Sequence, residues 1–355
     1  MTRPSQASID LAALGHNYLV ARKLHGGRAL AVVKANAYGH GALRCALALK
    51  DVADGFAVAF LDEAVELRSG GVQGPILLLE GCFDQEELVT AQRLDFWTTV
   101  HQQSQLQDIE RTSLPAGGLH VWLKINSGMN RAGFDAVHVN EAYRRLQACP
   151  AVASVTWMTH FARADEPASA ATARQIEAFD AATAGLPGDR SLCNSGGVLG
   201  WPHARRDWAR PGIELYGADP MPSPQHGLIP VMTLHSKIFA VRTLQPGDAL
   251  GYGGTFVASV PTRVGLVAIG YADGYPRSAP SGTPVAINGK LSRTLGRVSM
   301  DMMTVDLSDL PDAGMGSHVE LWGRQIDVNR VAQAAGTISY ELLCNVKRVP
   351  RVYTE

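Results

Sequence analysis

The sequence lacks a long apolar run, an excess of basic residues and any low-complexity segment. Spanning a bilayer takes about 20 apolar residues, and the N-terminal residues do not form the apolar core of a signal peptide. With a net charge of -1 at pH 7, the composition favours neither nucleic acid nor a membrane as a partner. We therefore expect a cytoplasmic protein that acts on small polar molecules.

Cysteine is scarce as well. Its five positions are odd in number and follow no spacing typical of a metal site or a disulfide framework. This pattern predicts reduced thiols and no bound metal. The cysteines are Cys45, Cys82, Cys149, Cys193 and Cys344.

The chain has, by contrast, the length and apolar content for two domains, with 355 residues of which 46% are hydrophobic. Over residues 1–227, short apolar runs alternate with amphipathic stretches. This alternation predicts a TIM-like α/β barrel of eight βα units, with an open doubly wound sheet as the alternative. The predicted strands are 31–34, 56–60, 76–79, 96–100, 120–125, 152–160, 191–194 and 213–216, and the predicted helices follow Asp10 and cover 62–68, 85–93, 140–148 and 172–184.

A second, mostly β domain is predicted for residues 228–355. Residues 218–227 contain three prolines and are therefore typical of a linker. The strand-like runs beyond them are separated by turn signals such as Asn288-Gly289. The predicted strands are 232–244, 263–269, 304–307 and 319–322, and one further helix is expected at 328–335.

Lys34 ends the first predicted strand and is followed by a turn of small residues, Ala-Asn-Ala-Tyr-Gly-His-Gly. A strand that delivers a lysine into such a turn can desolvate its amine, and a desolvated amine is a usable Schiff-base nucleophile. The alternative is a lysine that merely caps the strand in solvent. A Schiff base on a lysine is the chemistry of pyridoxal phosphate, but the position of Lys34 alone leaves both interpretations open.

Other candidates follow predicted strands at the same end of the barrel, where the functional residues of this fold lie. His160 ends the sixth strand, and Ser195 follows the seventh and opens a turn of small residues that can admit a phosphate. Arg210, Gly212 and Ile213 can add donors beside it. The alternatives are a core histidine and an ordinary tight turn.

Arg131 and Tyr252 are candidates of another kind. A guanidinium is the natural bidentate partner of an amino-acid carboxylate, although an ordinary surface arginine is the alternative for Arg131. Tyr252 lies between glycines at an expected exposed tip, a costly place for an aromatic ring unless another surface receives it. Tyr271 and Tyr275 lie in a similar segment, and their role stays open.

Together these segments resemble the alanine racemases, a pyridoxal-phosphate-dependent bacterial family of fold type III. The resemblance covers essentially the whole chain, and the order of the motifs is far more specific than any one of them. The motifs are Val-Val-Lys34-Ala-Asn-Ala-Tyr38-Gly-His-Gly, Ser-Gly-Met-Asn-Arg131-Ala-Gly-Phe, Met-Thr-His160-Phe, Asn-Ser195, Arg210-Pro-Gly212-Ile213, Gly-Tyr252-Gly, Gly-Tyr271-Ala-Asp-Gly-Tyr275, Ser-Met300-Asp301 and Ser-Tyr340-Glu-Leu-Leu.

The resemblance implies a role for each matching residue. Lys34 would carry pyridoxal phosphate, Arg210 would face its ring nitrogen, and His160 would lie beside them. Arg131 and the backbone of Met300 would receive the substrate carboxylate. The residues implied to hold the phosphate are Tyr38, Ser195, Gly212, Ile213 and Tyr340.

Members of this family are homodimers in which the β domain of one chain completes the site of the other. The resemblance therefore implies that Tyr252, Met300 and Asp301 act across the interface, with Tyr271 in support. Lys124 matches a lysine that is carbamylated in several members and there orients the arginine.

The implied activity is the interconversion of L-alanine and D-alanine, for peptidoglycan synthesis or for alanine catabolism. Racemisation needs an acid/base group on each face of the substrate. In the family, the lysine takes the α proton of the D-enantiomer and the tyrosine that of the L-enantiomer, which here implies Lys34 and Tyr252. We expect a hydrogen-bond chain from Tyr252 through His160 to Arg210 to favour the phenolate. Because an arginine does not yield its proton, the ring nitrogen should stay unprotonated, which disfavours transamination.

Three alternatives stay open. A broad-specificity amino-acid racemase would share the motifs, but such enzymes usually carry an export signal. A fold-related pyridoxal-phosphate decarboxylase normally sets a carboxylate against the ring nitrogen, where this chain has Arg210. A non-catalytic carrier of the cofactor would consist of the barrel alone, without residues 228–355.

Overall fold

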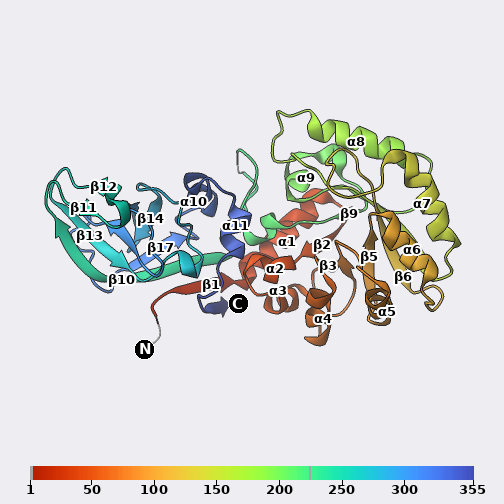
Figure 1. The fold of residues 1–355 in the computed structure, drawn as a ribbon, viewed down its shortest axis with the longest axis horizontal. Coiled ribbons are helices and arrows are strands. Elements are labelled where there is room, and N and C mark those ends of the chain that lie inside the picture. Colours follow the sequence, from red (N-terminus) through yellow and green to blue (C-terminus); the bar gives the residue numbers. More distant parts are fainter. Residues whose placement is uncertain (1–2, 224) are drawn as a thin grey trace.

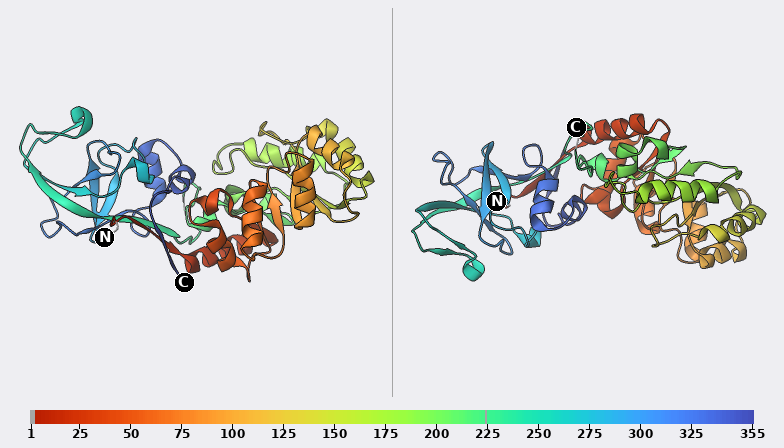
Figure 2. Two further views of the ribbon diagram at one scale, coloured as in Figure 1. Left: turned by 60° about the horizontal axis from the view of Figure 1, so that its bottom comes forward. Right: turned by 90° about the horizontal axis from the view of Figure 1, so that it is seen from above.

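The computed structural model describes residues 3–223 and 225–355 and has two lobes that lie side by side (Figure 1). Figure 2 shows the same separation from two further directions. One lobe contains most of the helices, and the other is built mainly from strands. Pro224, in the predicted linker, lies outside the described residues, as do the first two residues.

Eight strands form the barrel of the first lobe, in the order β8-β7-β6-β5-β4-β3-β2-β9, and the paired strands are all parallel. The segments that contain β8 and β9 are joined by isolated backbone hydrogen bonds, such as the one from Asp207 N–H to Arg190 O at 3.1 Å. The predicted fold class is confirmed. The strands are β2 (Arg28–Val32), β3 (Gly55–Val58), β4 (Ile76–Leu78), β5 (Phe96–Val100), β6 (Leu119–Lys124), β7 (Val152–Met158), β8 (Arg190–Ser191) and β9 (Trp208–Ala209).

Helices connect the barrel strands. The first begins where the Asp10 side chain accepts the N–H of Ala13 at 2.9 Å, and it ends at Gly26, whose φ of 82° favours glycine. The helices are α1 (Leu11–His25), α2 (Lys34–Tyr38), α3 (Ala42–Leu49), α4 (Leu61–Ser69), α5 (Gln85–Arg93), α6 (Gln103–Arg111), α7 (Ala136–Ala148), α8 (Ala171–Ala182) and α9 (Ser195–Gly200), with the 3-10 turns η1 (Pro202–Ala204) and η2 (Ile213–Tyr216).

The predicted eighth strand at 213–216 is wrong. These residues form η2, and the eighth strand is β9, which ends before Pro211. Proline has no N–H to offer a ladder, and the chain then turns, with Leu215 N–H donating to Gly212 O at 3.0 Å. The turn is as apolar as a strand because it packs against α1, where Asn17 donates to Leu215 O. Periodicity cannot separate the two structures in so short a run.

The second lobe has an eight-stranded sheet in the order β13-β16-β15-β14-β17-β10-β1-β18, in which a further pairing joins β13 to β10, and a separate two-stranded sheet of β11 and β12. Strand β1 pairs antiparallel with β10 and parallel with β18. The predicted first domain, 1–227, therefore includes one strand whose partners lie in the other lobe. The strands are β1 (Gln6–Asp10), β10 (Met232–Leu244), β11 (Ala249–Leu250), β12 (Phe256–Val257), β13 (Thr262–Val267), β14 (Pro284–Ile287), β15 (Lys290–Leu295), β16 (Met303–Asp306), β17 (His318–Trp322) and β18 (Arg351–Thr354).

Two helices lie in this lobe rather than the single one predicted: α10 (Val328–Ala335) and α11 (Ser339–Cys344). The second has only six residues, too few for a helical period to be visible in the sequence. It packs against α2 of the barrel and so joins the two lobes at the site described below. Within 3–223 and 225–355, no helix is long and apolar enough to cross a membrane.

Candidate active site

A cavity of about 330 Å³ opens where the carboxyl ends of the barrel strands meet. Its walls come from the segments after β2, β4, β6, β7, β8 and β9 and from α11. The volume lies within the range of small-molecule sites. The cavity brings together ten of the predicted site residues: Lys34, Tyr38, Lys124, Arg131, His160, Ser195, Arg210, Gly212, Ile213 and Tyr340.

Lys34 reaches the cavity from a left-handed turn. Residues 35–38 all have φ between 50° and 54°, a conformation that costs residues with a Cβ roughly 1–2 kcal/mol each. Surrounding bonds hold the turn, including that from Ala35 N–H to Glu63 Oε1 at 2.6 Å. The turn places the partly buried Lys34 and the ring of Tyr38 on the same cavity.

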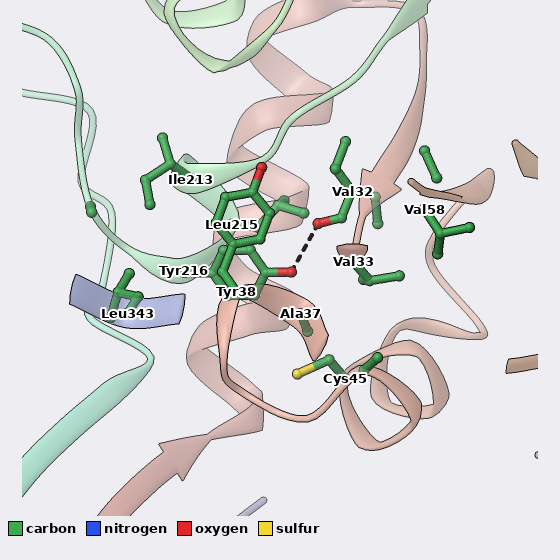
Figure 3. Packing of buried hydrophobic residues seen from close by; sticks show 14 of the residues in the cluster. Val32, Val33, Ala37, Tyr38, Cys45, Val58, Ile213, Leu215, Tyr216 and Leu343 are labelled. Carbon is green, nitrogen blue, oxygen red and sulfur yellow. Dashed lines mark hydrogen bonds between the residues drawn. The ribbon is translucent and has the colours of Figure 1, made fainter. Parts of the chain in front are cut away.

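Two tyrosines line the cavity, and a third packs against one of them. The ring of Tyr38 stacks on Tyr216 with centroids 4.8 Å apart and lies 5.9 Å from the ring of Tyr340. Tyr216 is fixed in turn because its hydroxyl donates to Val32 O at 2.9 Å (Figure 3). Burial raises the pKa of Tyr38 and of Tyr340, so both hydroxyls remain protonated and can donate hydrogen bonds.

Ser195 and Gly212 lie next to Tyr38 in the same cavity. The Ser195 hydroxyl is buried and accepts the N–H of Gly212 at 2.9 Å. A Cβ at position 212 would lie 2.6 Å from the Tyr38 hydroxyl oxygen, so only glycine leaves room there. Hydroxyls and the first N–H groups of α9 and η2, which have no acceptor inside their own helices, give this part of the cavity the donor set that an anion requires.

Arg210 is buried at the end of β9 and donates to backbone carbonyls of Thr159 and Ser191. Burial lowers its pKa to about 10, so it remains a cation at neutral pH. Burial, followed by the charge of Arg210, lowers the pKa of His160 well below its ordinary value, which keeps that imidazole neutral. The described residues contain no hydrogen bond between His160 and Arg210, contrary to the predicted chain. The two terminal guanidinium nitrogens donate instead to Ser191, Thr159 and Leu192.

Lys124 and Arg131 add positive charge to the same cavity. Lys124 is buried at the end of β6, and burial lowers its pKa to about 8, although the carboxylate of Glu80 opposes this shift. Arg131 is exposed at the rim of the cavity. With Lys34 and Arg210, these residues make the cavity suitable for anionic groups.

Four predicted site residues do not line this cavity: Tyr252, Tyr271, Met300 and Asp301. They lie in the β lobe, where Tyr252 is 70% exposed in the 3-10 turn η3 (Tyr252–Gly254) and Met300 is 57% exposed. Tyr271 begins another such turn, η4 (Tyr271–Asp273). Their predicted action on a second chain stays a prediction.

Sequence reasoning missed several lining residues, of which Glu80 and Cys344 are the polar ones with chemistry of their own. Glu80 follows β4, so the rule that found His160 and Ser195 would also have found it. Cys344 ends α11, a helix that the sequence did not reveal.

Models of two protein domains match the chain. The alanine racemase N-terminal domain matches residues 9–220, and the alanine racemase C-terminal domain matches residues 231–353. The two matches correspond to the barrel and to the β lobe, and they define the class to which this fold and this cavity belong.

Individual relatives agree. An alanine racemase of Azoarcus sp. (strain BH72) is 64% identical over 347 residues, which cover 98% of each chain. A catabolic alanine racemase of Pseudomonas putida is 55% identical over 354 residues and 99% of each chain. The structure of the biosynthetic alanine racemase from Pseudomonas aeruginosa has a TM-score of 0.97 to this chain at 46% identity, with 100% of both chains covered. The chain belongs to the alanine racemase family.

Proposed function

We propose that the protein interconverts L-alanine and D-alanine with pyridoxal phosphate as its cofactor. The observation that carries this proposal is the cavity that Lys34 shares with a set of neutral hydrogen-bond donors and a group of cations. The family supports it, since relatives with this activity in their names share more than half of the sequence. The same reaction serves peptidoglycan synthesis in one direction and alanine catabolism in the other.

The residues present fit this cofactor. An amine that can form a Schiff base stands at Lys34, and the hydroxyls of Ser195 and Tyr38 in the same cavity suit a phosphate. The N–H of Gly212 holds the Ser195 hydroxyl in place. Position 212 is backbone alone, as close approach of an anion requires. Ile213 and Tyr340 would complete the phosphate contacts, and Arg210 would face the ring nitrogen.

When bound at Lys34, pyridoxal phosphate withdraws electrons from the α carbon of alanine and so makes its proton removable. Arg131 would bind the substrate carboxylate. The amine of Lys124 repels a guanidinium rather than holding it, so Lys124 would orient Arg131 only as the carbamate that the family resemblance implies. The amine of Lys34 would then hold and move the α proton on one face. Arg210, a cation with a pKa of about 10, would leave the ring nitrogen without a proton, and transamination would be disfavoured.

A second base must act on the other face, and we infer that it is the partner subunit's Tyr252 in a homodimer. The exposed aromatic tip of η3 is 70% accessible in the single chain, although burying such a ring is favourable. Met300 and Asp301 would reach the same site from the partner, with Tyr271 in support. In an isologous dimer, each chain would complete the other's cavity. The five free cysteines are consistent with the cytoplasm as the place of action.

The test is a chiral assay of the purified, cofactor-loaded protein against a panel of single amino-acid enantiomers. We expect L-alanine and D-alanine each to approach the same racemic mixture, and Lys34→Ala to abolish the reaction. Comparable rates with many unrelated amino acids would instead support a broad-specificity racemase, and release of carbon dioxide would support a decarboxylase.

A further inference from the structure

Glu214 is a buried carboxyl that the proposed reaction does not use. It lies in η2 directly after Gly212 and Ile213 and is 0% exposed. Neither of its carboxyl oxygens has a hydrogen-bond partner within the described chain. An ionised carboxylate without a partner is among the costliest groups to bury, so this side chain is a neutral acid.

Among the described residues, the titratable groups whose charges are coupled to that of Glu214 come from several elements, and none of them is a cation. Asp219 follows η2 in the chain, Cys193 precedes α9, and Tyr340 belongs to α11. Burial and then the charge of Asp219 raise the pKa of Glu214 well above its ordinary value, whereas the Ser195 side chain, which is near enough to donate to an ionised Glu214, opposes this shift. The neighbours therefore favour the protonated form.

The hydroxyl of Ser195 connects Glu214 to the cavity. Its oxygen accepts the N–H of Gly212 at 2.9 Å and, more weakly, the N–H of Glu214 at 3.5 Å. The hydroxyl hydrogen is then the part of Ser195 that remains free to donate. It can point to an anion in the cavity, or it can point back to Glu214 if that carboxyl is ionised and accepts it.

We propose that Glu214 is a positioning residue: as a neutral acid it leaves Ser195 free to donate to the cofactor phosphate, and its ionisation weakens the hold on that phosphate. The inference rests on the proposed function, because it takes the anion at Ser195 to be the phosphate of pyridoxal phosphate. Ionised Glu214 accepts a hydrogen bond from the Ser195 hydroxyl and adds a negative charge next to the residues that hold the phosphate. By linkage, the bound phosphate favours protonated Glu214 to the same extent.

The decisive experiment titrates the cofactor-free protein with pyridoxal phosphate from about pH 6 to about pH 10 and follows tryptophan fluorescence. The wild-type protein is compared with Glu214→Gln, which has the same shape and cannot ionise. We expect the two affinities to converge at about pH 6 and the wild type to lose up to about tenfold per pH unit, relative to the variant, once Glu214 ionises. Ionisation of Lys34 and of the phosphate affects both proteins equally, so parallel curves would overturn the inference.

Two further arms separate this role from a merely structural one. Pyridoxal, which has no phosphate, should show no pH-dependent difference between wild type and Glu214→Gln, and Ser195→Ala in both backgrounds should shrink the difference seen with pyridoxal phosphate. A difference that persists unchanged in either arm contradicts the positioning role. Glu214→Met is a second neutral replacement if the glutamine variant does not fold. Failure of borohydride to fix the cofactor at Lys34 would instead contradict the proposed function itself.

Discussion

At the scale of single residues, the cavity concentrates cations that are costly to bury. Lys124 is 6% exposed, and the charges nearest to it include those of Arg210, Arg131 and Lys34 as well as the opposing Glu80. Such an arrangement suits a site that receives anions, but it lowers the stability of the empty protein. The cost is measurable because it depends on pH.

We expect Lys124→Met to stabilise the cofactor-free protein at pH 7. Burial lowers the pKa of Lys124 from 10.5 to about 8, so below about pH 8 the folded state holds a proton that it disfavours. Each pKa unit corresponds to about 1.4 kcal/mol, which gives a penalty of roughly 3 kcal/mol. Between these two pKa values the unfolded chain binds more protons, so wild-type stability should rise with pH and the advantage of the variant should fade.

Urea denaturation of both proteins from about pH 7 to about pH 11 checks this expectation. The buffers should be free of bicarbonate so that Lys124 remains an amine. An advantage of the methionine variant that stays constant over this range would mean that its cause is packing rather than the charge of Lys124.

The sequence could predict which residues line the cavity where those residues follow a strand-like apolar run. Lys34, His160 and Ser195 were found because each follows an apolar run, and the cavity contains all three. Glu214 could not be interpreted in the same way, because the sequence does not show that no partner reaches its carboxyl. That property depends on elements far apart in the chain.

At the scale of elements, the left-handed turn at residues 35–38 is the least ordinary feature of the barrel. The sequence does not predict this left-handed conformation, because alanine and tyrosine rarely adopt positive φ. The sequence therefore predicted where the turn lies but not that its backbone is left-handed. The missed η2 and α11 have a similar cause, since each is too short to show a period.

We expect Ala35→Gly to stabilise the protein by up to about 1 kcal/mol and Ala35→Val to destabilise it by about 1–2 kcal/mol. Ala35 is exposed with a φ of 53°, so the two substitutions change backbone strain more than packing. Ala48, an exposed alanine of the right-handed α3, is the matched control. Glycine there should destabilise by about 1 kcal/mol. The same sign for glycine at both positions would contradict the left-handed turn.

At the scale of the whole molecule, the two lobes share chain segments as well as a site. Strand β1 crosses to the β lobe, and α11 packs against α2. Such pairings join residues hundreds of positions apart, which local patterns cannot predict. The proposed dimer extends this sharing, because one chain would supply Lys34 and the other Tyr252.

Mixing two inactive variants tests the dimer. Random exchange between Lys34→Ala and Tyr252→Phe chains should make about half of the dimers mixed, each with one intact site, so that about a quarter of the wild-type activity returns. Each variant alone is the control, and exchange is verified with differently tagged chains. Verified exchange without recovered activity would place the two groups on one chain.

The most direct test of the two-base reaction is α-hydrogen exchange by the Tyr252→Phe variant in deuterated water, followed by NMR. Racemisation should be lost in both directions, because each turnover needs both groups. The variant retains Lys34, so D-alanine should still exchange its α hydrogen, whereas L-alanine should exchange about 10²- to 10⁴-fold more slowly than with the wild type. Equal exchange of the two enantiomers by this variant would contradict separate roles for Lys34 and Tyr252.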